Sequence, residues 1–181
     1  TAMAAVAGAV ADEILSVMRD AADLDRIYVN NGGDIALYLH PAAVAVPHYT
    51  VGICADPDVV FRSHVSLGML AGDRATRSVP DAFAGTIKIT AADHIGGIAT
   101  SGWKGRSHSL GLADLVTVLA PTAAAADVAA TLIANAVWPD DDSETDWPGV
   151  HRQPANALAP DSDLGSRLVT VYVDCLPDHV I

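Results

Sequence analysis

Two alanine-rich segments constrain the fold of this chain more than any other feature of its sequence. Residues 2–19 and 122–137 consist mainly of strong helix formers, and Gly8 is the exception within the first segment. The first two turns of that segment are apolar on every side, so the sequence predicts a helix that is buried inside the protein. Thr122, directly after Pro121, is the candidate N-cap of the second helix.

The rest of the chain alternates between short apolar runs and turns, as strands do. Residues 25–40 contain two such runs on either side of an Asn-Gly-Gly-Asp turn, which predicts a β-hairpin. An acidic surface loop is expected at 138–146 and a long connection at 152–168. Helix, several strands, helix and strand in this order predict a single α+β domain over 1–181, with a largely antiparallel sheet packed with helices. The further strands are expected at 48–55, 59–67, 85–93, 96–103, 114–120 and 168–175.

Composition excludes several classes of function. The 22 acidic residues outnumber the 10 basic ones, and the net charge of −12 argues against nucleic acid or an anionic membrane as partner. Apolar residues make up 51% of the chain, yet no run reaches the roughly 18 residues that span a bilayer. We therefore expect a protein that buries surface in a homo-oligomer. Cys54 and Cys175 form neither a CxxC pair nor a disulfide framework, which fits the cytoplasm.

The Asn-Gly-Gly-Asp turn is the first candidate for ligand binding. Gly32 and Gly33 allow a ligand to approach the backbone closely, and their amides can meet an anion. Asn30, Asn31 and Asp34 add polar side chains on either side. The same residues also suit a plain hairpin turn, and both interpretations stay open.

Residues 99–114 form the second candidate site. This glycine-rich segment contains two cations, an imidazole and several hydroxyls around three glycines. Such a set of polar groups suits an anionic or carbonyl-bearing small molecule. An exposed loop without a ligand is the alternative. The candidate binding residues are Thr100, Ser101, Lys104, Arg106 and His108.

Asp127 and Thr131 form the third candidate site. They are four residues apart on the second predicted helix, so they lie on the same face. Their neighbours are apolar, and a carboxylate in such surroundings needs a metal ion, a cation or hydrogen bonds. A metal site and a purely structural role at the helix N-terminus are both compatible with this pattern.

Four of these segments together resemble the ApbE-like superfamily, in particular its short bacterial and archaeal branch. They are VNNGGDIAL, IATSGW, GRSHSLGLADLVTVLAP and ADVAATLIANAV. ApbE proteins use magnesium to transfer FMN from FAD to a protein Thr or Ser. The resemblance implies an ApbE-like fold in which Asp127 and Thr131 help to bind the metal. It also places 32–34 on the family's Gly-Gly-Asp turn and 100–102 on its Ala-Thr-Ser-Gly strand end.

Two parts of the family pattern have no counterpart in this sequence. One is the segment His-Ile-x-Asp-Pro-x-Thr-Gly, and the other is the set of N-terminal strands. We therefore expect a domain that lacks those strands, or that a separate upstream fragment of the same precursor completes.

Thr1 gives the leading functional hypothesis. A free α-amine with a pKa near ~8 can act as the base for the hydroxyl of the same residue, as in N-terminal nucleophile hydrolases. Autoproteolysis of a precursor is the favoured origin of this end, and trimming and a plain translation start remain open as alternatives. The prediction is an amidohydrolase, without a required cofactor, that acts on a small cyclic amide or a heteroaromatic acid. Donors would come from Asn30, Asn31, Gly32 and Gly33, and Lys104, Arg106 and His108 would orient the substrate.

Two other hypotheses remain open. A magnesium-dependent flavin transferase, or a flavin-binding protein, would use Asp127 and Thr131 together with Mg and FAD or FMN. A non-catalytic binding subunit would use the acidic chain to pair with another protein.

Overall fold

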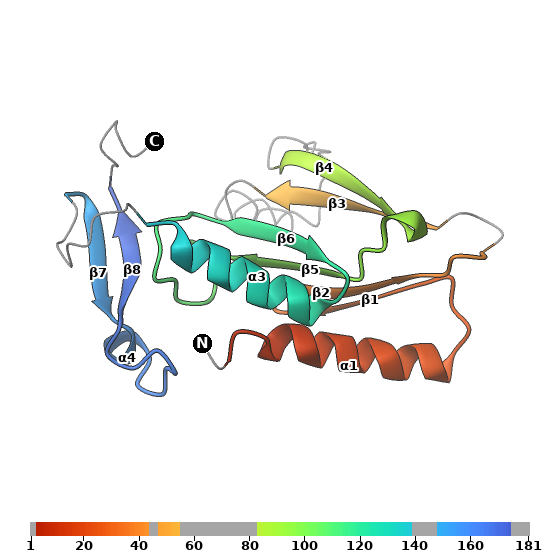
Figure 1. Ribbon diagram of the computed structural model, residues 1–181, viewed down its shortest axis with the longest axis horizontal. Coiled ribbons are helices and arrows are strands. Elements are labelled where there is room, and N and C mark those ends of the chain that lie inside the picture. The colour runs from red at the N-terminus through yellow and green to blue at the C-terminus, as the bar shows by residue number, and fades with distance from the viewer. Residues whose placement is uncertain (1–2, 44–46, 55–82, 139–147, 175–181) are drawn as a thin grey trace, which may run out of the picture.

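A computed structural model describes residues 3–43, 47–54, 83–138 and 148–174. Two long helices, α1 (Val6–Ala21) and α3 (Ala123–Ala136), pack on a four-stranded antiparallel sheet (Figure 1). The sheet has the order β1-β2-β5-β6. The predicted α+β class and antiparallel sheet are therefore confirmed. The strands of this sheet are β1 (Arg26–Asn31), β2 (Asp34–Leu39), β5 (Gly97–Ser101) and β6 (Val116–Ala120).

Small side chains on one face of the sheet allow the two helices to lie very close to it. Ala36 and Ala99 are buried on this face, under alanines of α1 and α3. A Cβ atom added to Gly97 would stand only 2.2 Å from the backbone nitrogen of Ala123. The alanine content of the helices thus serves close packing as well as helix propensity.

Larger side chains fill the opposite face of the sheet. Leu37, Leu39 and Ile98 pack there against Ile89, which is fully buried. Ile89 belongs to a separate two-stranded antiparallel sheet that covers this face (Figure 1). This sheet consists of β3 (His48–Cys54) and β4 (Phe83–Thr90), and the one-turn helix η2 (Ala91–Asp93) follows β4.

The predicted hairpin at the Asn-Gly-Gly-Asp turn is confirmed. Asn31 pairs with Asp34, so Gly32 and Gly33 form a two-residue turn, and their φ angles are 70° and 116°. Only glycine adopts such backbone angles readily. The Gly33 amide also donates to Oδ1 of Asn30 over 2.9 Å, which closes the turn.

The expectation that the first helix is buried on all sides is wrong. Only Gly8, Ala11 and Leu15 are buried, on the face that meets α3 and the sheet. The opposite apolar face of α1 points away from α3 and the sheet, and it is exposed in the single chain. Its most exposed apolar side chains are Val6, Val10, Ile14 and Val17, which are 44–60% exposed.

The connection expected over 152–168 is also wrong in part. It contains most of β7 (Val150–Pro154) and all of α4 (Ala155–Leu158), and β7 pairs with β8 (Leu168–Val173). Polar side chains dominate β7, so it lacks the apolar alternation that reveals strands. The strand expected at 59–67 lies outside the described residues, as does nearly all of the 138–146 loop. Among the described helices, none combines the length and the apolar character that crossing a bilayer requires.

Candidate functional site

The helices α1 and α3 cap each other's N-termini through two aspartates. Oδ2 of Asp127 in α3 accepts a 3.0 Å hydrogen bond from the Gly8 amide in the first turn of α1. In return, the Asp12 carboxylate of α1 accepts from the amides of Ala123 and Ala124, each over 2.9 Å. These amides have no partner within their own helix, so each carboxylate satisfies donors that the other helix leaves free.

A glycine makes this arrangement sterically feasible. A Cβ atom on Gly8 would stand 2.4 Å from the carbonyl oxygen of Ala123, which is shorter than any real contact. The two helix N-termini therefore meet at Gly8, and the helix-disfavouring residue of the first segment has a packing role.

The hairpin between β1 and β2 also contacts the first turn of α1. The side-chain amide of Asn31 donates to the carbonyl oxygen of Ala7 over 3.1 Å, which ties β1 to the first turn of α1. Asp34, paired with Asn31 across the hairpin, is half-buried. Burial, and secondly the negative charge of Asp127, raise the pKa of Asp34 from 3.8 to about 6.

Asp34 and Asp127 together form an acidic pair near the start of α1. Burial also raises the pKa of Asp127, and the hydrogen bond from Gly8 partly opposes that shift. Two half-buried carboxylates that repel each other favour the uptake of a proton or a cation. We call Asp34, Asp127 and the first turn of α1 the acidic cluster.

The cluster offers oxygen ligands for a metal ion but does not enclose one. No three His, Cys, Asp or Glu side chains gather as a metal site anywhere in the ranges that the structure describes. Thr131, one turn after Asp127 in α3, is half-buried. Magnesium commonly uses one or two carboxylates and completes its shell with water and substrate phosphate. Asp34 and Asp127 are thus oxygen ligands of the kind that magnesium uses, and water or a ligand would have to complete the shell.

The second candidate site, residues 99–114, contributes the guanidinium group of Arg106 next to the hairpin turn. A Cβ atom on Gly32 would stand 3.5 Å from Nη1 of Arg106, so this guanidinium lies beside the turn. Lys104, by contrast, pairs with Asp114 at 2.8 Å, and His108 is exposed. Of the hydroxyls, Thr100 shares a 2.9 Å hydrogen bond with Thr117, and Ser101 is buried.

Several predicted donors already have partners within the chain. The backbone amide of Gly33 donates to the side-chain oxygen of Asn30, and the side-chain amide of Asn31 donates to the carbonyl oxygen of Ala7. These bonds give Asn30, Asn31 and Gly33 a role in shaping the turn. Thr1 lies outside the described residues, so its predicted role as nucleophile stays a prediction.

Sequence reasoning missed Asp12, although one signal could have found it. Asp12 interrupts an apolar helical stretch just as Asp127 does, and this pattern had singled out Asp127. The partner of each aspartate is more than a hundred residues away, so the sequence alone does not reveal it.

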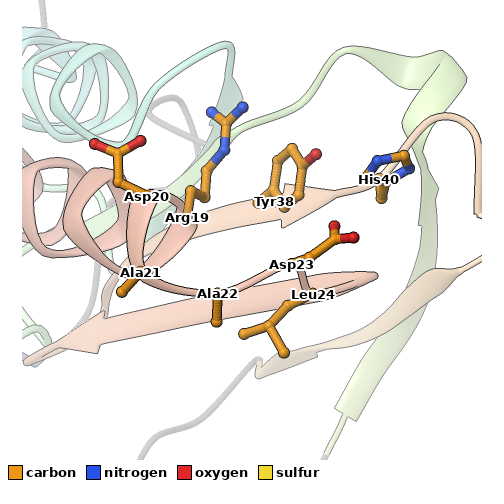
Figure 2. Close-up of a pocket in the computed structure, with 8 residues that line it drawn as sticks. All are labelled: Arg19, Asp20, Ala21, Ala22, Asp23, Leu24, Tyr38 and His40. Atoms are coloured by element: carbon orange, nitrogen blue, oxygen red, sulfur yellow. The ribbon is translucent and has the colours of Figure 1, made fainter.

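A shallow cavity of about 430 Å³ lies at the other end of α1 (Figure 2). In it the Arg19 guanidinium lies 4.1 Å from the centre of the Tyr38 ring, and His40 flanks the same ring. Arg19 comes eleven positions after Gly8 in α1, which corresponds to roughly 16 Å along the helix axis. This cavity is therefore separate from the acidic cluster.

Comparison with known proteins places the chain in a family. The family described as "AbpE bacteria" matches residues 1–181. The chain belongs to this family. A "UPF0280 protein" of Methanothrix thermoacetophila is 32% identical over 139 residues, which cover 76% of this chain and 46% of that relative. The match thus spans less than half the length of that relative, and no solved structure matches the chain.

Proposed function

We propose that the acidic cluster holds a magnesium ion together with the phosphate of a flavin nucleotide, as in flavin-binding proteins of the ApbE type. The observation that carries the proposal is the half-buried pair of Asp34 and Asp127 at the start of α1. A divalent cation beside this pair would offset the repulsion between the two carboxylates more fully than a proton does. The sequence resemblance to ApbE proteins adds FMN and FAD as the ligands to test first.

The surrounding groups suit a phosphate ligand. Arg106 beside Gly32 can pair with phosphate oxygens, and a guanidinium does so with two parallel hydrogen bonds. Asp127 would bind the cation while its Oδ2 stays bonded to the Gly8 amide. The ion would supply charge neutralisation between the carboxylates and the phosphate. Transfer of FMN from FAD to a protein hydroxyl is the reaction that this site would support: the hydroxyl oxygen would replace AMP on the FMN phosphate, with release of AMP and a proton.

Flavin titration tests the proposal. FMN and FAD fluorescence is followed as protein is added, with and without Mg²⁺, for the wild type, Asp34→Asn and Asp127→Asn. In Asp127→Asn, the asparagine side chain keeps an oxygen that accepts from the Gly8 amide, so the helix cap is retained while the negative charge is lost. Asp20→Asn, an exposed position at the other end of α1, is the matched control.

We expect Mg²⁺ to strengthen flavin binding in the wild type and in Asp20→Asn. The same gain should be lost in Asp34→Asn and Asp127→Asn. A wild-type protein that binds neither flavin at any Mg²⁺ concentration would overturn the proposal.

An amidohydrolase that uses Thr1 is the second candidate. One contact favours it: the side-chain amide of Asn31 donates to the carbonyl oxygen of Ala7, which ties the first turn of α1 to the cluster. A Thr1→Ala variant separates the two candidates. The amidohydrolase predicts that this variant loses hydrolysis of cyclic amides and heteroaromatic acid amides, whereas the flavin site predicts unchanged flavin binding.

A further inference from the structure

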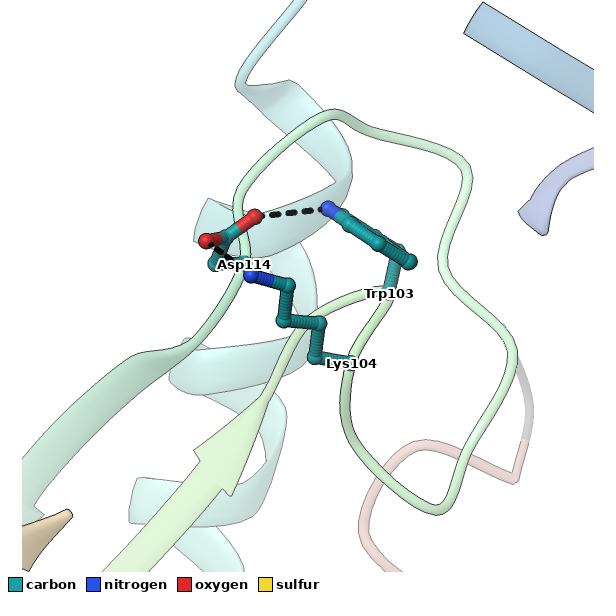
Figure 3. A network of polar contacts seen from close by, with 3 residues as sticks. All are labelled: Trp103, Lys104 and Asp114. Atoms are coloured by element: carbon teal, nitrogen blue, oxygen red, sulfur yellow. Dashed lines mark hydrogen bonds and ion pairs between the residues drawn. The ribbon is translucent and has the colours of Figure 1, made fainter. Parts of the chain in front are cut away.

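The loop between β5 and β6 is fixed at its neck by one carboxylate. Asp114 accepts from the indole N–H of Trp103 and from the ammonium group of Lys104, each over 2.8 Å (Figure 3). Backbone bonds reinforce the neck, because the amides of Trp103 and Lys104 donate to the carbonyls of Ala113 and Asp114. Gly102 is required here because a Cβ atom would stand 2.3 Å from the Asp114 carbonyl oxygen.

A second anchor holds the loop a few residues later. The side-chain oxygen of Asn135 in α3 accepts from the Leu110 amide at 2.8 Å and from the Ser109 hydroxyl at 3.3 Å. The Ser109 carbonyl accepts from the Thr170 amide of β8 at 2.9 Å, and Ser109 is 1% exposed. Residues 105–108 thus form a short arc that is held at both ends.

The arc carries three exposed polar side chains of this loop. Arg106, Ser107 and His108 are exposed, and Arg106 reaches the hairpin turn at Gly32. A long, flexible arginine loses less conformational entropy on binding a ligand when its backbone is already fixed. Holding the arc therefore matters for the affinity of any anion that Arg106 contacts.

We propose that Asp114 is a positioning residue that, by holding Trp103 and Lys104 together, sets the 105–108 arc so that Arg106 meets the ligand's phosphate. This inference rests on the proposed flavin site. It predicts that Asp114 raises the affinity only for ligands that carry a phosphate group, and only when Arg106 is present. A purely structural role would weaken every ligand alike.

A double-mutant cycle with two ligands tests the proposal. FMN and riboflavin, which lacks the phosphate, are titrated in Mg²⁺ into the wild type, Arg106→Ala, Asp114→Ala and the double variant. Asp114→Ala should weaken FMN about fivefold and leave riboflavin unchanged, since the contacts of Asp114 are partly exposed. The double variant should bind FMN no more weakly than Arg106→Ala. Equal losses for both ligands, or additive losses in the double variant, would overturn it.

Two further variants and a ligand-free measurement keep the test decisive. Trp103→Phe keeps the ring but removes the indole donor, and Asp114→Asn keeps an acceptor for that donor but removes the ion pair. Each should give a smaller loss of FMN affinity than Asp114→Ala. Hydrogen exchange without ligand should show amides of the 105–108 arc exchanging about fivefold faster in Asp114→Ala, with α3 unchanged.

The exchange measurement also separates this inference from the proposed function. Faster exchange in a protein that binds no flavin would support the hold on the arc and refute the flavin site. Unchanged exchange in Asp114→Ala would refute the positioning role, whatever the wild type binds.

Discussion

Replacement of Asp12 by alanine tests the mutual capping of the two helices. The change removes both carboxylate oxygens that accept from the first amides of α3, while the Thr122 hydroxyl keeps its own bond to the Ala125 amide. Ala123 is fully buried, so water does not replace its lost partner. Asp12→Ala should therefore destabilise the fold without changing the residues of the acidic cluster.

The size of the effect follows from the two amides. A buried donor without a partner costs about 1–3 kcal/mol. The half-buried Ala124 amide and the lost charge at the helix N-terminus add about 1 kcal/mol. The higher helix propensity of alanine offsets about 0.5 kcal/mol of this loss in the free energy of unfolding. The net loss is about 1.5–3.5 kcal/mol, which lowers the melting temperature of a chain of this length by about 3–14 °C.

Thermal and urea unfolding, followed by circular dichroism, measure this loss. Glu13→Ala is the matched control, since Glu13 is the next residue of α1 and is exposed, and its change should stay below about 0.5 kcal/mol. Asp12→Asn keeps one acceptor and should lose about half as much as Asp12→Ala. Equal stability of Asp12→Ala and Glu13→Ala would refute the capping argument.

Three further predictions concern the same part of the fold. Gly8→Ala places a Cβ atom 2.4 Å from a backbone oxygen and should cost about 2–3 kcal/mol in urea unfolding despite alanine's helix propensity, whereas Ser16→Ala on the exposed side should cost almost nothing. The pKa of Asp34 is higher in the folded protein than its ordinary 3.8, so its contribution to stability is fully present below about pH 4 and is lost as the pH rises through about 6. Asp34→Asn should remove this loss and be about 1 kcal/mol more stable than the wild type at about pH 7.5, a figure reduced for partial exposure; equal pH profiles for both proteins would contradict the assignment. Val10→Glu on the exposed face of α1 should leave the fold intact and convert the expected homo-oligomer to monomer in sedimentation; a wild type that is already monomeric would contradict the oligomer.

Local chemistry explains which parts of the fold could be predicted from the sequence. The Gly-Gly turn requires positive φ angles, and Thr122 has the geometry of a good N-cap, so both features follow from neighbouring residues. The helix α3 was predicted within one residue at each end. The strand β7 was missed because its residues are mostly polar and show no apolar alternation.

Long-range contacts explain what could not be predicted. The sequence left open whether Asp127 has a structural role or a ligand role, and the structure supplies its partner, the amide of Gly8. The same holds for Asp12 and Asp114, because the role of each depends on a partner that the sequence does not reveal. Asp12 accepts from the distant amide of Ala123, and Asp114 accepts from the indole N–H of Trp103 across the loop. The exposed face of α1 shows that apolar side chains on every side of a helix do not ensure burial on every side.

Binding of Mn²⁺ as a spectroscopic substitute for Mg²⁺ tests the central claim most directly. Paramagnetic resonance counts the free ion as it is titrated into the protein with FMN, at about pH 7.5 and at about pH 5. The account predicts one bound ion per chain at the higher pH, weaker binding once Asp34 is protonated, and loss of binding in Asp34→Asn and Asp127→Asn but not in Asp20→Asn. Equal binding by all four proteins at both pH values would contradict it.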